Sequence, residues 1–106
     1  MITARRYHCL TTFVGGKYLM VTGGWKAGSM LSNGLNSCEL YNIDQNSWKN
    51  ITPMNKARRS HAAIEVKLGT IYVFCGNKGK AYSGKYHDSI EYYTQKSDTW
   101  MDIQHD

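Results

Sequence analysis

The chain has 106 residues, of which 42% are apolar and 12% aromatic, and 13 Lys and Arg residues against 8 Asp and Glu give a formal net charge of +5. This length suits one small folded domain, the aromatic content argues against disorder, and no apolar stretch is long enough to cross a membrane. Because the N-terminus lacks the apolar core of a secretory signal and the three cysteines lack disulfide or metal spacing, we expect a cytoplasmic protein with no cofactor, metal or membrane association.

The first half of the chain contains four predicted strands. Residues 8–14 predict an inner strand, and the continuous apolar run 18–22 predicts a buried second strand. Between them, Gly15 and Gly16 predict a tight hairpin, because Gly adopts the positive φ that such turns need. The alternating segment 37–41 predicts a half-exposed third strand, and a fourth is expected around Trp48.

The same order of elements returns in the second half. Residues 61–66 and 71–75 predict an inner and a second strand joined by a turn at 67–69. Residues 89–93 predict a third strand, and a fourth surrounds Trp100. No segment shows sustained helical spacing, so the sequence predicts an all-β fold of two four-stranded antiparallel sheets.

The two halves are repeats of one another. Tyr, Glu and Trp residues of the second half follow their counterparts by 52 positions, and residues nearer the start of each half follow by 53, so one deletion in the intervening loop reconciles the two steps. The pairs at 52 are Glu39 and Glu91, Tyr41 and Tyr93, and Trp48 and Trp100; those at 53 are Arg6 and Arg59, His8 and His61, Gly16 and Gly69, and Gly23 and Gly76. A period of this length is typical of propeller blades.

The ordered set of an apolar strand, a Gly doublet, a Tyr six residues before a Trp, and Pro53-Met54 leading into residues 58–61 resembles the kelch repeat. The resemblance covers nearly the whole chain as two blades, 3–53 and 54–103. It implies an all-β fold of two four-stranded antiparallel blades of a kelch-type β-propeller, incomplete as a ring. Counted from the hairpin glycines, the doublet falls on Thr22-Gly23 and Cys75-Gly76, and Gly24 restores it only if the first repeat is one residue longer.

Residues that recur in both repeats are expected to be structural. We expect the aromatic side chains Tyr41, Tyr93, Trp48 and Trp100 to pack between adjacent sheets, Gly23 and Gly76 to form turns, and His8 and His61 to have structural roles. Glu39 and Glu91 stand in apolar strands, so if buried they need a partner such as Arg6 or Arg59.

Two long Gly-rich loops, 24–36 and 76–86, are the candidate recognition elements. The resemblance implies that they share one face with the link between the blades. Basic and aromatic groups on such a face suit a protein or acidic peptide partner, although the lysines could equally serve only to keep the loops soluble. The candidate partner-binding residues are Trp25, Lys26, Arg58, Arg59, Lys78, Lys80 and Tyr82.

No nucleophile motif or ligand-spaced histidine cluster is present, and no recognised nucleic-acid module accompanies the positive charge. We therefore expect a non-catalytic protein-interaction module and no nucleic-acid partner. The resemblance implies a substrate receptor of a cullin-type ubiquitin ligase or a cytoskeletal scaffold. The alternative is a fragment of a kelch-propeller enzyme whose active site needs the missing blades. Because two blades cannot close a ring, the remaining blades would come from the same longer chain, from self-association or from another subunit.

Overall fold

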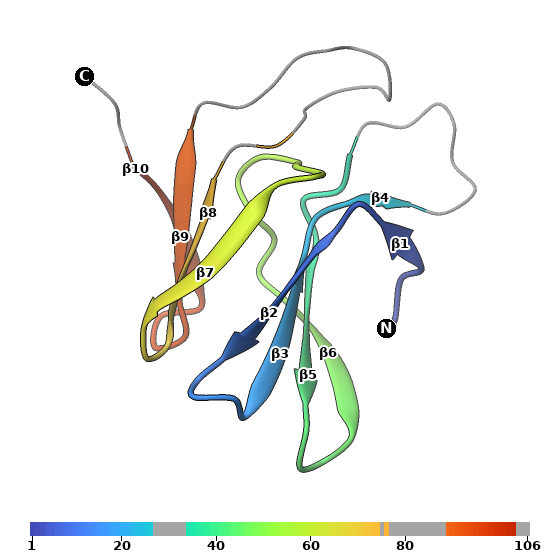
Figure 1. Cartoon of the computed structure of the whole chain (residues 1–106), viewed down its shortest axis with the longest axis vertical. Helices are drawn as coiled ribbons and strands as arrows, with labels where there is room; N and C mark the ends of the chain where they lie inside the picture. The colour runs from blue at the N-terminus through green and yellow to red at the C-terminus, as the bar shows by residue number, and fades with distance from the viewer. Residues whose placement is uncertain (27–33, 75, 77–88, 104–106) are drawn as a thin grey trace.

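The computed structural model describes residues 1–26, 34–74, 76 and 89–103, and every regular element in these ranges is a β-strand (Figure 1). No helix among them is long and apolar enough to cross a membrane. The strands are β1 (Arg5–Arg6), β2 (Cys9–Phe13), β3 (Tyr18–Thr22), β4 (Trp25–Lys26), β5 (Cys38–Asn42), β6 (Ser47–Ile51), β7 (Ala62–Lys67), β8 (Thr70–Phe74), β9 (Ile90–Thr94) and β10 (Thr99–Ile103).

Eight of these strands form two antiparallel four-stranded sheets, in the orders β2-β3-β5-β6 and β7-β8-β9-β10. The predicted all-β architecture of two blades is therefore confirmed. Within each sheet the strands pair in the order in which they follow along the chain, as short apolar or alternating segments separated by turns favour, and β4, between β3 and β5, belongs to another sheet. The two inner strands, β2 and β7, lie in contact, so the sheets diverge from a shared inner edge (Figure 1).

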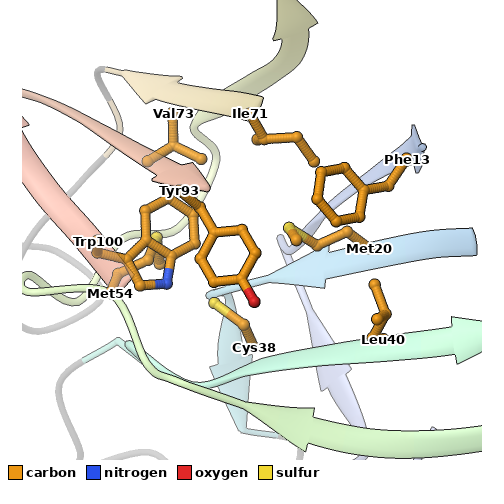
Figure 2. Close-up of a cluster of buried hydrophobic side chains, with 9 residues drawn as sticks. All are labelled: Phe13, Met20, Cys38, Leu40, Met54, Ile71, Val73, Tyr93 and Trp100. Carbon is orange, nitrogen blue, oxygen red and sulfur yellow. The ribbon is translucent and has the colours of Figure 1, made fainter. Parts of the chain in front are cut away.

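The hydrophobic core lies between the two sheets (Figure 2). Phe13 and Met20 of the first sheet point toward Ile71 and Tyr93 of the second, and the ring centroids of Phe13 and Tyr93 are 5.9 Å apart. Met54, from the link between the sheets, is 1% exposed and closes this core. Because burial of apolar surface is the main favourable term in folding, packing of one sheet on the other holds the two repeats together.

A small two-stranded sheet was not predicted from the sequence. β1 pairs with β4 in an antiparallel register that places Arg5 opposite Lys26 and Arg6 opposite Trp25. It fastens the segment that enters the first sheet to the segment that leaves β3. Each strand has only two residues, too few to show a recognisable period.

The register of the strands shows where the one-residue deletion between the repeats lies. The neighbours of Val21 on β2 and β5 are Leu10 and Glu39, and the neighbours of Val73 on β7 and β9 are Ala63 and Glu91. The step is therefore 53 on the inner strand and already 52 on the second strand. The deletion falls in the β7–β8 hairpin, where the register shifts between Glu65 and Lys67. The expected position, in the loop that follows the second strand of the repeat, is therefore wrong.

This register makes Gly24, not Gly23, the counterpart of Gly76. A Cβ atom on Gly24 would lie 2.7 Å from the Arg6 carbonyl oxygen and 2.9 Å from the His8 Cβ. On Gly76 it would meet the equivalent atoms of Arg59 and His61 at 2.9 and 2.7 Å, and both glycines have positive φ. The pairing of Gly23 with Gly76 in the sequence comparison is thus wrong by one residue. The first repeat has the doublet Gly23-Gly24, and the second has Cys75-Gly76.

Candidate functional site

The candidate site is the edge of the sheets at which β3 and β8 end and the link 52–61 enters β7, which we call the loop face (Figure 1). The short hairpin turns lie at the opposite edge, which we call the turn face. Antiparallel pairing places the ends of β3, β6 and β8 and the starts of β5 and β9 at the loop face, so the sheets form a rigid support for the residues there.

Two buried ion pairs anchor the segments of the loop face. Arg5 donates from Nη2 to the Glu39 carboxylate at 2.7 Å and from Nη1 to the carbonyl oxygens of Gly23 and Ser37 at 2.9 Å each. All four charged side chains of the two pairs have no exposed surface. Such pairs are stable only when further hydrogen bonds satisfy the remaining donors and acceptors, as the Gly23 and Ser37 carbonyls do here.

The second repeat reproduces this arrangement. Arg58 donates from Nη2 to Glu91 at 3.1 Å and from Nη1 to the Ser89 carbonyl oxygen at 2.9 Å. The choice of Arg6 and Arg59 as partners of the buried glutamates is therefore wrong. The partners are the preceding arginines, and each pair lies within its own repeat.

Each buried carboxylate also binds the backbone of the segment that enters its repeat. Glu91 accepts hydrogen bonds from the backbone N–H groups of Asn55 and Lys56 at 2.6 and 3.2 Å. Glu39 accepts equivalent bonds from Ile2 and Thr3 at 2.5 and 3.2 Å. The glutamates expected to be structural therefore hold both the arginine and the link in place.

Trp25 and Arg59 form a buried contact between the repeats beneath the loop face. Their side chains are 3% and 7% exposed, and the guanidinium carbon of Arg59 lies 5.2 Å from the Trp25 ring centroid, within the range of a cation–π interaction. The Arg58 carbonyl oxygen also accepts a hydrogen bond from the Gly24 N–H at 2.7 Å. The sequence analysis placed Trp25, Arg58 and Arg59 on the surface as partner contacts, and the structure instead places their side chains inside.

The exposed groups of the loop face include three basic side chains and one aromatic side chain. Arg6, Lys26 and Lys56 are exposed, and so is Tyr7, at 55%. The Arg6 guanidinium carbon lies 5.7 Å from the Tyr7 ring centroid. Tyr7 has a φ of 57°, and its carbonyl oxygen accepts a hydrogen bond from the Ser60 N–H at 2.7 Å, which joins the entries to the two inner strands.

Sequence reasoning missed Tyr7 as a member of this face. Its counterpart in the second repeat is Ser60, which is also exposed and has a φ of 54°. A position that differs between repeats, between arginine and histidine residues that do not, is the signal that could have identified it. Lys26 lies where the sequence predicted it, on the loop face. Lys78, Lys80 and Tyr82 lie outside the described residues.

The repeated aromatic residues pair within each sheet. The rings of Tyr93 and Trp100 are 5.2 Å apart and buried between the sheets, as expected, and the Trp100 indole N–H donates to the Thr52 carbonyl oxygen at 2.8 Å. Burial raises the pKa of the Tyr93 hydroxyl most, and the hydrogen bond to Asp98 raises it further. The equivalent rings of Tyr41 and Trp48 are 4.9 Å apart but only half-buried, because no strand of the described residues covers that side of the first repeat.

Of the two repeated histidines, His61 contacts the other sheet. The Nε2 atom of His61 lies 2.7 Å from the Thr22 hydroxyl of the first sheet, which supports the expected structural role. Within the described ranges, no three His, Cys, Asp or Glu side chains are grouped so that they could hold a metal ion.

Comparison with known proteins identifies the repeat. The model of the kelch motif matches residues 5–55 and 58–104. An F-box/kelch-repeat protein of Arabidopsis thaliana is 27% identical over 71 residues, which cover 67% of this chain and 17% of that protein. A fungal alcohol oxidase solved in complex with copper has a TM-score of 0.77 at 9% identity, over 94% of this chain and 22% of its own. The chain thus spans about a fifth of the length of these proteins, and the resemblance to the oxidase concerns the fold alone.

Proposed function

Because this chain belongs to the kelch motif family, we propose that its two β-propeller blades are part of a non-catalytic module that binds a protein or peptide through the loop face. The observation that carries the proposal is the exposed set Arg6, Tyr7, Lys26 and Lys56 on one edge of a rigid scaffold. Recognition residues commonly lie on loops that such scaffolds hold in place.

The charge of the loop face favours an acidic partner. Two glutamates stand close to this edge, Glu39 and Glu91, but both are buried and neutralised by arginines. Asp102, opposite Glu91 on β10, is exposed, so among the described residues of this edge the exposed cations Arg6, Lys26 and Lys56 outnumber the exposed carboxylates. Arginine can bind a carboxylate through two parallel hydrogen bonds, and an exposed tyrosine supplies the large contact area typical of interface hot spots.

Binding of a fluorescently labelled Asp/Glu-rich peptide, followed by anisotropy, tests this proposal. We expect the double substitution R6E/K26E to abolish most of the binding. The matched control is K17E/K96E, which makes the same charge change at exposed positions of the turn face. Equal losses in both variants would show that net charge, rather than the loop face, attracts the peptide. Binding of an unrelated oligonucleotide but not of the peptide would also overturn the proposal.

We further propose that the polypeptide carrying these blades recognises substrates for a cullin-type ubiquitin ligase in the cytoplasm. The similarity to an F-box/kelch-repeat protein supports this role over those of a cytoskeletal scaffold or of a propeller-enzyme fragment. Affinity capture of the complete polypeptide, followed by mass spectrometry, should recover a cullin. Recovery of cytoskeletal proteins without a cullin would instead favour the scaffold.

A further inference from the structure

The backbone of Arg58, a residue of the second repeat, holds both ends of the first long loop, 24–36. Its carbonyl oxygen accepts a hydrogen bond from the Gly24 N–H at 2.7 Å, and its N–H donates to the Leu35 carbonyl oxygen at 3.1 Å. The Leu35 N–H in turn donates to the Gly24 carbonyl oxygen at 2.7 Å. These three bonds form a closed ring, so the start and the end of the loop are fixed to each other and to Arg58.

The side chain of Arg58 fastens this ring to the second sheet. Its Nη1 donates to the Ser89 carbonyl oxygen at 2.9 Å, and its Nη2 donates to the Ser89 hydroxyl at 3.0 Å and to Glu91 at 3.1 Å. Ser89 directly precedes β9 and follows the second long loop in the chain. Because the guanidinium is fully buried and its hydrogen bonds to Glu91 join two charges, the second sheet determines where the Arg58 backbone lies.

The end of the first loop packs closely on the link between the repeats. A Cβ atom on Gly34 would lie 3.4 Å from the Gly24 carbonyl oxygen and 3.8 Å from the Arg58 carbonyl carbon. Two residues further on, the Asn36 carbonyl oxygen accepts a hydrogen bond from the Met54 N–H at 2.8 Å, and the Asn36 side-chain amide donates to the Met54 carbonyl oxygen at 3.2 Å. The loop is therefore attached to the second repeat at two places along the link.

Lys26 is the loop-face residue that this arrangement positions. It follows Gly24 by two residues, and Trp25 between them is buried against the guanidinium of Arg59. Both residues before Lys26 thus contact the second repeat, while its strand pairs with β1 of the first repeat. The exposed cation is held from both repeats.

We propose that Arg58 is a positioning residue for the loop face, which holds Lys26 of the first repeat at a fixed place relative to Lys56 on the link. One acidic segment can then contact the cations of both repeats at once. Groups that are already positioned lose less conformational freedom on binding, so this arrangement increases affinity. The inference rests on the proposed function for the binding of the segment, and on the hydrogen bonds above for the positioning.

Amide hydrogen exchange of the free chain, measured by NMR spectroscopy, tests the positioning. The variant R58M/E91Q removes the guanidinium without leaving a buried charge. Exchange at Gly24 and Leu35 should become about tenfold faster relative to the amides of β3 in the same sample. This ratio separates local loosening of the loop ends from a general loss of stability. An unchanged ratio in the folded variant would overturn the inference.

E65Q is the matched control, because Glu65 also connects the two repeats, but at the turn face. Its carboxylate accepts hydrogen bonds from the Val14 N–H at 2.7 Å and from the Gly69 N–H at 3.0 Å. E65Q should leave the ratio at the loop ends as it is in the wild type. The same increase in E65Q and R58M/E91Q would show that any weakened contact between the repeats loosens the loop, and would also overturn the inference.

Anisotropy with the labelled Asp/Glu-rich peptide tests what the positioning does for binding. R58M/E91Q should weaken binding by about fivefold or more, although neither side chain reaches the surface. In a K26A background the same double substitution should have little further effect, because the cation that Arg58 positions is gone. Losses that simply multiply would contradict the positioning of Lys26.

The two measurements fail in different ways. If the wild-type chain does not bind the peptide, the proposed function is wrong, and the exchange measurement still decides whether Arg58 holds the loop. Circular dichroism reports whether R58M/E91Q folds. If it does not, S89A replaces it, because this substitution removes only one hydroxyl acceptor of the guanidinium. S89A should shift the exchange ratio in the same direction by a smaller factor, and no shift would overturn the inference.

Discussion

Replacing Arg58 with Met is expected to cost about 3–5 kcal/mol of the free energy of unfolding, the usual cost of breaking a buried ion pair from one side. Arg58 is 0% exposed and makes hydrogen bonds of 2.9 to 3.3 Å to Glu91 and Ser89. Methionine keeps the apolar stem but leaves the Glu91 carboxylate buried without its guanidinium partner, although the backbone N–H groups of Asn55 and Lys56 still donate to it.

Small domains have a total stability of about 5–15 kcal/mol, so this loss is a large fraction of it. Urea unfolding followed by tryptophan fluorescence measures the loss as a fall in the transition midpoint. The matched control is R6M, which removes an exposed arginine and should change stability by no more than about 0.5 kcal/mol.

The double variant R58M/E91Q separates an ion-pair effect from a packing effect, because glutamine keeps an acceptor for the backbone N–H groups of Asn55 and Lys56. Removing both charges leaves no uncompensated carboxylate, so the double variant should be more stable than R58M alone. If R58M matches R6M in stability, or if R58M/E91Q is less stable than R58M, the buried pair does not carry the energy assigned to it.

Three further predictions can be tested on the same chain, two by substitution and one by the reactivity of its cysteines. G24A should be less stable than G16A, because both alter a residue at positive φ, but only the Cβ of G24A would approach a backbone carbonyl oxygen, at 2.7 Å; equal stabilities would contradict this. W100F should lower the free energy of unfolding by about 1 kcal/mol in urea, because the Trp100 indole N–H donates to the backbone carbonyl oxygen of Thr52 in the first repeat. An unchanged free energy would show that this bond contributes nothing. Burial raises the pKa of the Cys38 thiol to about 12, so alkylation in mildly alkaline buffer should modify half-buried Cys9 before Cys38, and early modification of Cys38 would refute its burial. For the same reason the free energy of unfolding should fall as pH rises above 9.0.

The strands were predictable because their signals are local. An apolar run such as 18–22 ends at Gly23, and the segment 37–41 alternates in polarity, so each strand carries its own limits in the sequence. The repeat then confirmed each signal a second time. β1 and β4 were missed since two residues each form no pattern, and their pairing depends on the register of the whole repeat.

The ion-pair partners were not predictable because both repeats contain two adjacent arginines. Arg5 and Arg6 recur as Arg58 and Arg59, so the spacing cannot tell which of the two points inward. In β1 the alternation of a strand buries Arg5 and exposes Arg6. In the second repeat both arginines are buried, and the ring of Trp25 covers the second one.

The exposed side of the candidate site was predictable only in part. The sequence identified the loop face and Lys26, but it also placed Arg58 and Trp25 there. Burial of these two side chains depends on contacts more than 30 positions away along the chain, between Arg58 and Glu91 and between Trp25 and Arg59. No local pattern in the sequence reports such contacts.

That each glutamate finds its arginine and its backbone donors inside the same repeat has a consequence for descent. A gene segment encoding one such unit brings both members of the charged pair with it when it is duplicated. The glutamate of the new copy is neutralised by the arginine of the same copy, so the neighbouring repeat need not supply one. Only the apolar sides of the sheets and the contact between Thr22 and His61 must then diverge to suit the adjoining repeat. Arrays can therefore lengthen by whole units without a stage in which a buried carboxylate stands alone.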